Sequence, residues 1–192
     1  MRLRIIACIV FLSLAWPAFS QSLSFRKEDG SYLQIATKFQ YDYSAINLLK
    51  DLSERTGVAL AYVLDKNTDE KQYFVSFLLE TEKRFSFHAS SKLLIKTFKG
   101  SNIILKELLE GGDALSMNIN HAASVIKYSI IPCYKINLDD LQLIMNEGIA
   151  KMQFMTTAGA YIRHYDKEDL LGKKLLQEYK FLEKKSDFES GF

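Results

Sequence analysis

The sequence has few of the residues that form cross-links, turns and linkers. Its 192 residues include two cysteines, two prolines and nine glycines, while 48% are hydrophobic. So little proline and glycine excludes a collagenous or linker-like chain, and so many hydrophobic residues exclude a disordered one. One of the two cysteines, Cys8, lies in an apolar N-terminal segment, which leaves Cys133 alone in the rest of the chain. We therefore expect a domain stabilised by its hydrophobic core, without an intrachain disulfide.

The first 20 residues have the pattern of a secretory signal peptide. Two arginines precede an apolar run over residues 5–16, and Ala18 and Ser20 are the small residues expected before a cleavage site. The run is shorter than the ~20 residues that span a membrane, so we expect cleavage before Gln21; an uncleaved anchor is the alternative. Position 21 is not a cysteine. The sequence thus predicts an exported protein, periplasmic or extracellular, soluble and not a lipoprotein.

The chain also lacks an excess of either charge. It has 25 Lys and Arg against 23 Asp and Glu, and two of the basic residues belong to the expected signal peptide. Nucleic-acid-binding proteins normally carry a basic patch, so we expect no nucleic-acid partner, and no transmembrane segment in the mature chain. Beyond the signal, we expect a flexible leader over 21–31, a single domain over 32–185 and a frayed tail over 186–192.

Hydrophobic periodicity predicts an α+β fold with a mainly antiparallel sheet. About seven or eight short strands are expected, in one layer or as a sandwich-like pair of layers, and the residues with this alternating or β-favouring pattern are 33–41, 58–64, 73–79, 84–88, 92–98, 103–107, 125–131 and 150–156. The clearest hairpin covers 93–105, where Gly100 marks the turn. The strands follow one another in hairpins, which favours antiparallel pairing over a doubly wound parallel sheet.

About three helices are expected, each from its own end signals. A helix over 45–56 has Ser44 as its N-cap and Gly57 after its end, and a second of about ten residues follows the cap residue Asn137 and stops at Gly148. Asp166 caps a C-terminal helix in which four apolar residues form a stripe, namely Leu171, Leu175, Tyr179 and Leu182.

No motif for catalysis, cofactor binding or metal binding is present in the sequence. The three histidines, His88, His121 and His164, stand more than 30 residues apart, so no metal-ligand spacing occurs. There is no G-x-S-x-G elbow and no glycine-rich phosphate loop. Cys133 follows a proline at the end of a predicted strand, where we expect a structural thiol; a reactive thiol and an intermolecular disulfide are the alternatives. We expect no catalytic residue, cofactor or metal.

Aromatic residues are the one feature above the ordinary range. Most lie at alternating strand positions and are expected in the core. Five aromatic or imidazole side chains lie at the predicted ends of elements, where they could line a surface that stacks on sugars or contacts a protein; ordinary packing at the rim is the alternative. These candidate residues are Tyr41, Tyr43, Tyr161, His164 and Tyr165.

Residues 39–63, FQYDYSAINLLKDLSERTGVALAYV, resemble the strand-helix-strand of the short N-terminal domain found in secretins and TonB-dependent transducing receptors. The second strand-helix half of such a domain does not follow, and no residue role is transferred. The resemblance implies contact with another protein in the bacterial envelope.

Together these features favour a non-enzymatic binding or interaction domain of the bacterial envelope, which would bind a protein or a glycan. An exported hydrolase with a carboxylate or cysteine site is one alternative, and a structural or assembly component of an envelope complex is another.

Overall fold

The computed structural model describes residues 23–41, 55–110, 116–120, 125–165 and 170–187. The expected signal peptide, most of the expected helix over 45–56, Tyr43 and the expected cap Asp166 lie outside these residues.

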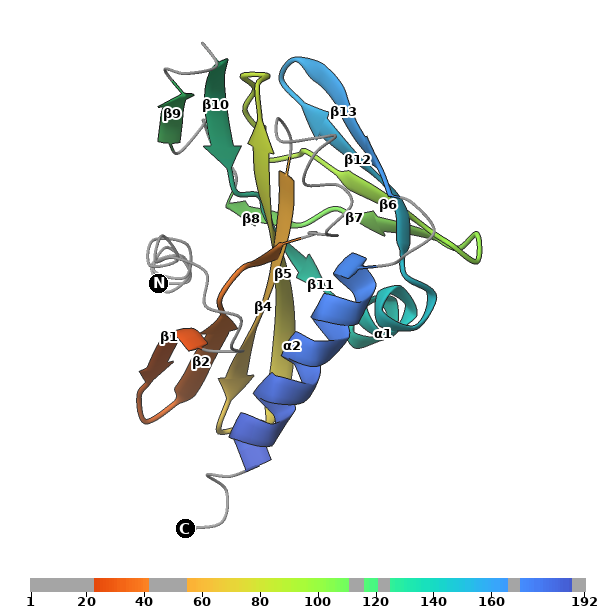
Figure 1. Ribbon diagram of the computed structural model, residues 1–192. Coiled ribbons are helices and arrows are strands. Elements are labelled where there is room, and N and C mark those ends of the chain that lie inside the picture. Colours follow the sequence, from red (N-terminus) through yellow and green to blue (C-terminus); the bar gives the residue numbers. More distant parts are fainter. Residues whose placement is uncertain (1–22, 42–54, 111–115, 121–124, 166–169, 188–192) are drawn as a thin grey trace.

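Two antiparallel sheets make up most of the described fold. Nine strands form sheet A, whose main order is β1-β2-β4-β5-β10-β9, with β3 beside β4 and β11 between β5 and β8. The strands of sheet A are β1 (Leu23–Glu28), β2 (Tyr32–Thr37), β3 (Gln40–Tyr41), β4 (Arg55–Asp65), β5 (Glu70–Thr81), β8 (Leu108–Glu110), β9 (Ser116–Asn120), β10 (Val125–Ile130) and β11 (Cys133–Ile136). The long hairpin of β4 and β5 runs through the centre of the molecule (Figure 1).

Sheet B has four strands in the order β13-β12-β6-β7 and lies beside sheet A (Figure 1). Its strands are β6 (Leu93–Thr97), β7 (Asn102–Leu105), β12 (Ile149–Thr156) and β13 (Gly159–His164). The described helices are α1 (Leu138–Glu147), which leads directly into β12, and α2 (Leu170–Asp187), which packs on β4 and β2.

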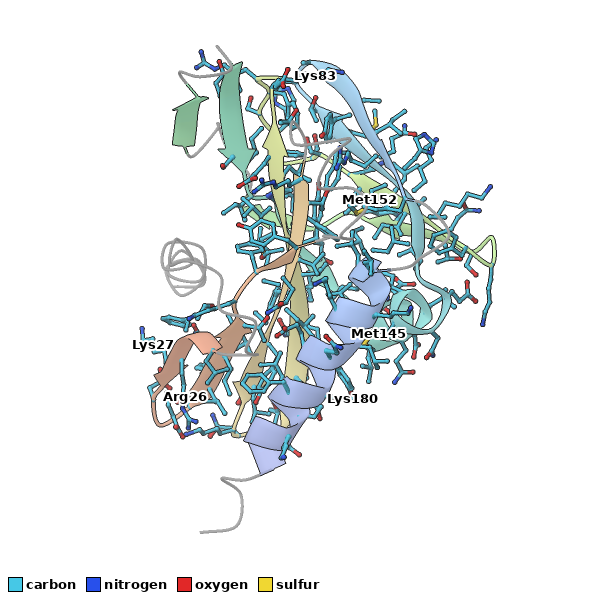
Figure 2. The ribbon with its side chains drawn as sticks, in the orientation of Figure 1. Arg26, Lys27, Lys83, Met145, Met152 and Lys180 are labelled. Atoms are coloured by element: carbon cyan, nitrogen blue, oxygen red, sulfur yellow. The ribbon has the colours of Figure 1, made fainter. Side chains whose placement is uncertain are left out.

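One large hydrophobic core joins both sheets and both helices. Sheet A meets sheet B where the rings of Phe77 and Phe154 contact edge to face, with centroids 5.8 Å apart. Met152 of β12 and Met145 of α1 also point into this core (Figure 2). The apolar stripe expected on the C-terminal helix faces inward, with Leu171, Leu175 and Leu182 buried and Tyr179 packed against the core.

The opposite face of sheet A carries a second, smaller group of buried side chains, formed by Ala36, Ala61, Phe74 and Cys133. Cys133 is only 1% exposed. Its burial agrees with the structural role expected for this thiol.

The sheet-rich α+β class and the antiparallel pairing are confirmed. The described residues contain two helices rather than three, and the last two residues of the expected helix over 45–56 instead begin β4. Gly57 therefore lies within a strand, where an added Cβ would contact the side chains of Leu78 and Tyr41 at 3.4 Å.

Helix α1 was predicted correctly from its end signals. The side chain of Asn137 accepts a hydrogen bond from Asp140 N, and Gly148 has a φ of 73°.

Several strands were not expected from the sequence. Residues 23–28, assigned to the leader, form β1 and pair with β2. Pro132 was expected to end a strand, but the chain resumes as β11 on the same partner, β5, and the Pro132 carbonyl accepts a hydrogen bond from Phe77 N. Strands β8, β9 and β13 were also unexpected. Conversely, residues 84–88 form no strand, although Phe85 and Phe87 are buried as the alternation requires.

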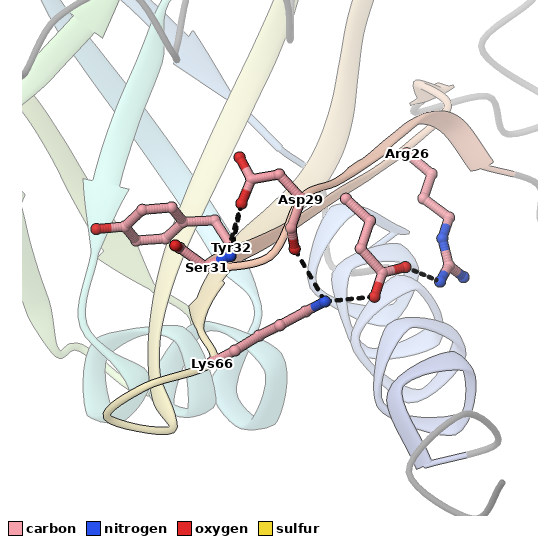
Figure 3. A network of polar contacts seen from close by, with 6 residues as sticks. Arg26, Asp29, Ser31, Tyr32 and Lys66 are labelled. Carbon is pink, nitrogen blue, oxygen red and sulfur yellow. Dashed lines mark hydrogen bonds and ion pairs between the residues drawn. The ribbon is translucent and has the colours of Figure 1, made fainter.

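Polar contacts at the surface hold two turns of sheet A together (Figure 3). Asp29 accepts hydrogen bonds from the backbone N–H groups of Ser31 and Tyr32, which fixes the turn between β1 and β2. Lys66, in the turn between β4 and β5, donates to the Glu28 carboxylate, which Arg26 also contacts at 2.8 Å. These two cations lower the pKa of Glu28. Through this network, the turn of the β1–β2 hairpin contacts the turn of the β4–β5 hairpin.

No helix among the described residues is long and apolar enough to cross a membrane.

Candidate functional site

The face of sheet B that points away from the core exposes large apolar side chains. In β6 and β7, and from Lys151 onward in β12, alternate residues point into the core, as does Tyr161 of β13. The residues between these inward positions form what we call the outer face. Four of the outward apolar residues are between 36% and 49% exposed: Leu94, Ile104, Met155 and Ile162. Phe98, in the turn after β6, is 38% exposed.

Three of these residues lie in one line across the whole sheet. Ile104 of β7 is the register partner of Leu94 in β6, Leu94 is opposite Gln153 in β12, and Gln153 is opposite Ile162 in β13. We call these four residues the apolar row. Leu94 and Ile104 are direct neighbours in this row, and Gln153 separates Leu94 from Ile162. Exposed apolar side chains that gather on one face occur at binding surfaces.

Basic side chains flank the apolar row on both sides. On one side, Lys151 lies two residues from Gln153 along β12. It is opposite Lys96 of β6 and His164 of β13. In the other direction lie Lys92, whose carbonyl accepts from Met155 N, and Lys106, which follows β7. The two groups of cations and the apolar row together define the outer face.

No acidic residue balances these cations within sheet B. The sequences of β6, β7, β12 and β13 contain neither Asp nor Glu. None of the four lysines Lys92, Lys96, Lys106 and Lys151 forms an ion pair with any residue that the structure describes. Like charges directly opposite one another on neighbouring strands are destabilising, so the facing pair Lys96 and Lys151 costs stability in the isolated domain.

The residues expected from the sequence to line a binding surface are not gathered in one place. Tyr161 is 6% exposed and its ring packs on Phe85, with centroids 4.8 Å apart, so it belongs to the core. Tyr165 is half-buried and donates a hydrogen bond to Thr56 Oγ1 at 3.0 Å. Tyr41 is also half-buried and is the register partner of Gly57, next to Thr56 in β4.

Of the four expected site residues that the structure describes, His164 alone lies on the outer face. It ends β13 and is exposed, opposite Lys151. Tyr43 lies outside the described residues. The role of these five residues in binding remains a prediction.

The apolar row and its lysines were missed in the sequence, although a signal was present. Strands covered on one face alternate apolar and polar residues, whereas Leu93-Leu94-Ile95 and Ile103-Ile104-Leu105 are apolar at every position. Such runs in a hairpin place apolar side chains on both faces, and the core covers only one of them.

A buried acid lies on the far side of the molecule, between α2 and sheet A. Glu178 is 0% exposed, and neither carboxylate oxygen has a hydrogen-bond partner among the described residues. Burial raises the pKa of Glu178 to about 7, against the smaller opposing effects of the Thr37 hydroxyl, the Lys174 charge and the Gln40 side chain. Because the carboxyl group is fully enclosed, a substrate cannot reach it.

The end of α2 is held to the central hairpin by a second polar group. Lys71 Nζ lies 3.1 Å from a Glu183 oxygen, and the Tyr73 hydroxyl donates to the same carboxylate at 3.1 Å. Burial and the Glu183 charge raise the pKa of Tyr73. Within the described parts of the chain, no three His, Cys, Asp or Glu side chains come together as a metal site would require.

Comparison of the chain with known protein families, with curated proteins and with solved structures gives no match.

Proposed function

We propose that this protein is a non-enzymatic interaction domain of the bacterial envelope, and that it binds a segment of another protein on the outer face of sheet B. The apolar row carries the proposal, because it crosses all four strands and its aliphatic side chains remain exposed in the folded chain. Burying such side chains against a partner contributes about 25 cal/mol for each Å² of apolar surface removed from water.

The shape and chemistry of the outer face favour a protein over other ligands. Sugars are usually stacked on aromatic rings, but the apolar row holds aliphatic side chains and one amide. Peripheral membrane binding requires apolar groups that enter the lipid, whereas the side chains of the apolar row project from a sheet face among neighbouring side chains and are at most about half exposed. An apolar centre with a polar rim is the usual anatomy of a protein interface.

Site-specific photocrosslinking in the native envelope tests this function. A photoreactive amino acid at Ile104 or Ile162 should give adducts with the same identified protein, and Leu94→Ser should abolish both adducts. The matched control is the same probe at Lys180, an exposed position on α2 (Figure 2). The probe at this position should give no adduct. Equal crosslinking from Lys180, or adducts with lipid alone, would contradict the proposal.

A further inference from the structure

We infer that the partner segment is acidic, with carboxylates on both sides of an apolar centre. This inference rests on the proposed function and adds the chemistry of the partner. It follows from the arrangement of charge around the apolar row. Lysines without an ion-pair partner among the described residues lie along both flanks, and none of the four strands contains a carboxylate.

Strand geometry sets the spacing that the partner must match. Residues two apart along a strand are separated by about 7 Å, and neighbouring strands by about 4.8 Å. The apolar row therefore spans roughly 14 Å across four strands, and the cations lie about 7 Å to either side of it. One flank presents Lys96, Lys151 and His164, and the other presents Lys92 and Lys106. A complementary segment places its apolar side chains centrally and its carboxylates at both margins.

Two lysines near sheet A show how a cation can be neutralised within the fold. Lys66, in the turn between β4 and β5, contacts Glu28, and Lys71 of β5 contacts Glu183. On sheet B, Lys96 and Lys151 instead face each other across neighbouring strands. A partner carboxylate between them would remove this repulsion and add charge-assisted hydrogen bonds. Complementary charge would also speed association, with a dependence on salt concentration.

A peptide selection tests the inference while the partner is still unidentified. The purified full chain is used to select binders from a phage-displayed library of random peptides, and the recovered peptides are measured by fluorescence anisotropy. We expect recovered sequences to combine apolar residues with Asp and Glu. The double variant Lys96→Glu/Lys151→Glu should bind them at least about tenfold more weakly, which corresponds to about 1.4 kcal/mol. Raised salt should weaken wild-type binding.

Two further variants separate failure of this inference from failure of the proposed function. The matched control Lys173→Glu/Lys180→Glu changes two exposed lysines of α2 and should bind like the wild type. Leu94→Ser/Ile104→Ser shortens the apolar row. If it abolishes binding while the Lys96/Lys151 variant binds unchanged, the acidic chemistry is wrong but the interaction face stands. If it leaves binding unchanged, the proposed function itself fails.

Two other outcomes would overturn the inference in favour of a different ligand. The first outcome begins with a selection that recovers no peptide. The wild type then sediments with vesicles of phosphatidylglycerol and phosphatidylethanolamine, whereas the Lys96→Glu/Lys151→Glu variant does not. This result would assign the outer face to an anionic membrane. The second is a concentration-dependent dimer that Ile104→Ser dissociates, which would assign the outer face to a second copy of the chain.

Discussion

Replacing Glu178 by glutamine should make the protein more stable at neutral and alkaline pH. The carboxyl group is fully enclosed between α2 and sheet A, and no described residue donates a hydrogen bond to either oxygen. Ionisation in that position leaves a buried charge without full compensation. Glutamine keeps the shape of the side chain and removes the charge.

The size and direction of the effect follow from the raised pKa. The folded-state pKa is about 7, against 4.5 for the unperturbed group, and each pKa unit corresponds to 1.36 kcal/mol. The folded protein therefore holds this proton more tightly than the unfolded chain does. The stability it contributes is complete below about pH 4.5, is lost as pH rises towards 7, and is absent above that. The total loss is about 3 kcal/mol.

Urea unfolding at pH 5 and pH 8 provides the measurement. With an m-value of about 1 to 3 kcal/mol/M, the Glu178→Gln midpoint should exceed the wild-type midpoint by roughly 1 M or more at pH 8. At pH 5, just above the unperturbed pKa of 4.5, the difference between the two midpoints should be several-fold smaller. Glu70→Gln, at an exposed position in β5, is the control and should follow the wild type at both pH values. Equal pH dependence of Glu178→Gln and wild type would refute the reasoning, because the carboxylate would then be compensated in the folded state.

Three other substitutions or reactions test the fold. Phe154→Ala should cost about 3 to 5 kcal/mol in urea unfolding, because it removes a fully buried ring that contacts Phe77 and Phe87 where the sheets meet; a loss below about 1 kcal/mol would mean that the sheets do not pack there. Asn137→Ala should cost about 1 kcal/mol in the same assay by removing the cap of α1, and an unchanged midpoint would show that the cap contributes nothing. Cys133, buried in sheet A, should react with a thiol reagent only after denaturation, so rapid alkylation of the native protein would contradict its placement.

The parts of the fold that were predictable are those with local signals. Helix α1 is bounded by its N-cap residue Asn137 and by Gly148 at its end, and the β6–β7 hairpin contains its own turn signal. Neither needs information from distant residues, so both could be read from the sequence.

The missed parts depend on distant partners. Strand β11 follows Pro132, which is a local stop signal, yet the open edge of β5 pairs with the chain on both sides of that proline. The C-terminal half of strand β1 consists of exposed charged residues. The strand forms because β2 supplies a pairing partner. The candidate site was missed for the same reason. The continuous apolar run Leu93-Leu94-Ile95 indicates apolar side chains on both faces of β6. Which of the two faces is covered depends on sheet A, whose strands are distant in the sequence.

The position of β12 makes the completion of sheet B depend on two distant parts of the chain. Strand β12 inserts between β6 and β13, and its partner β6 was completed some fifty residues earlier in the sequence. Without residues 149–164, β6 and β7 would have only each other as partners in sheet B, and the ribbon would carry apolar residues on both faces. A ribbon of two strands is marginally stable alone, and exposed apolar strands in incomplete chains favour aggregation. The surface proposed for binding thus depends on the last two strands of the sequence, and a chain that stops before β12 would expose the β6–β7 ribbon to misassociation instead of presenting a complete interface.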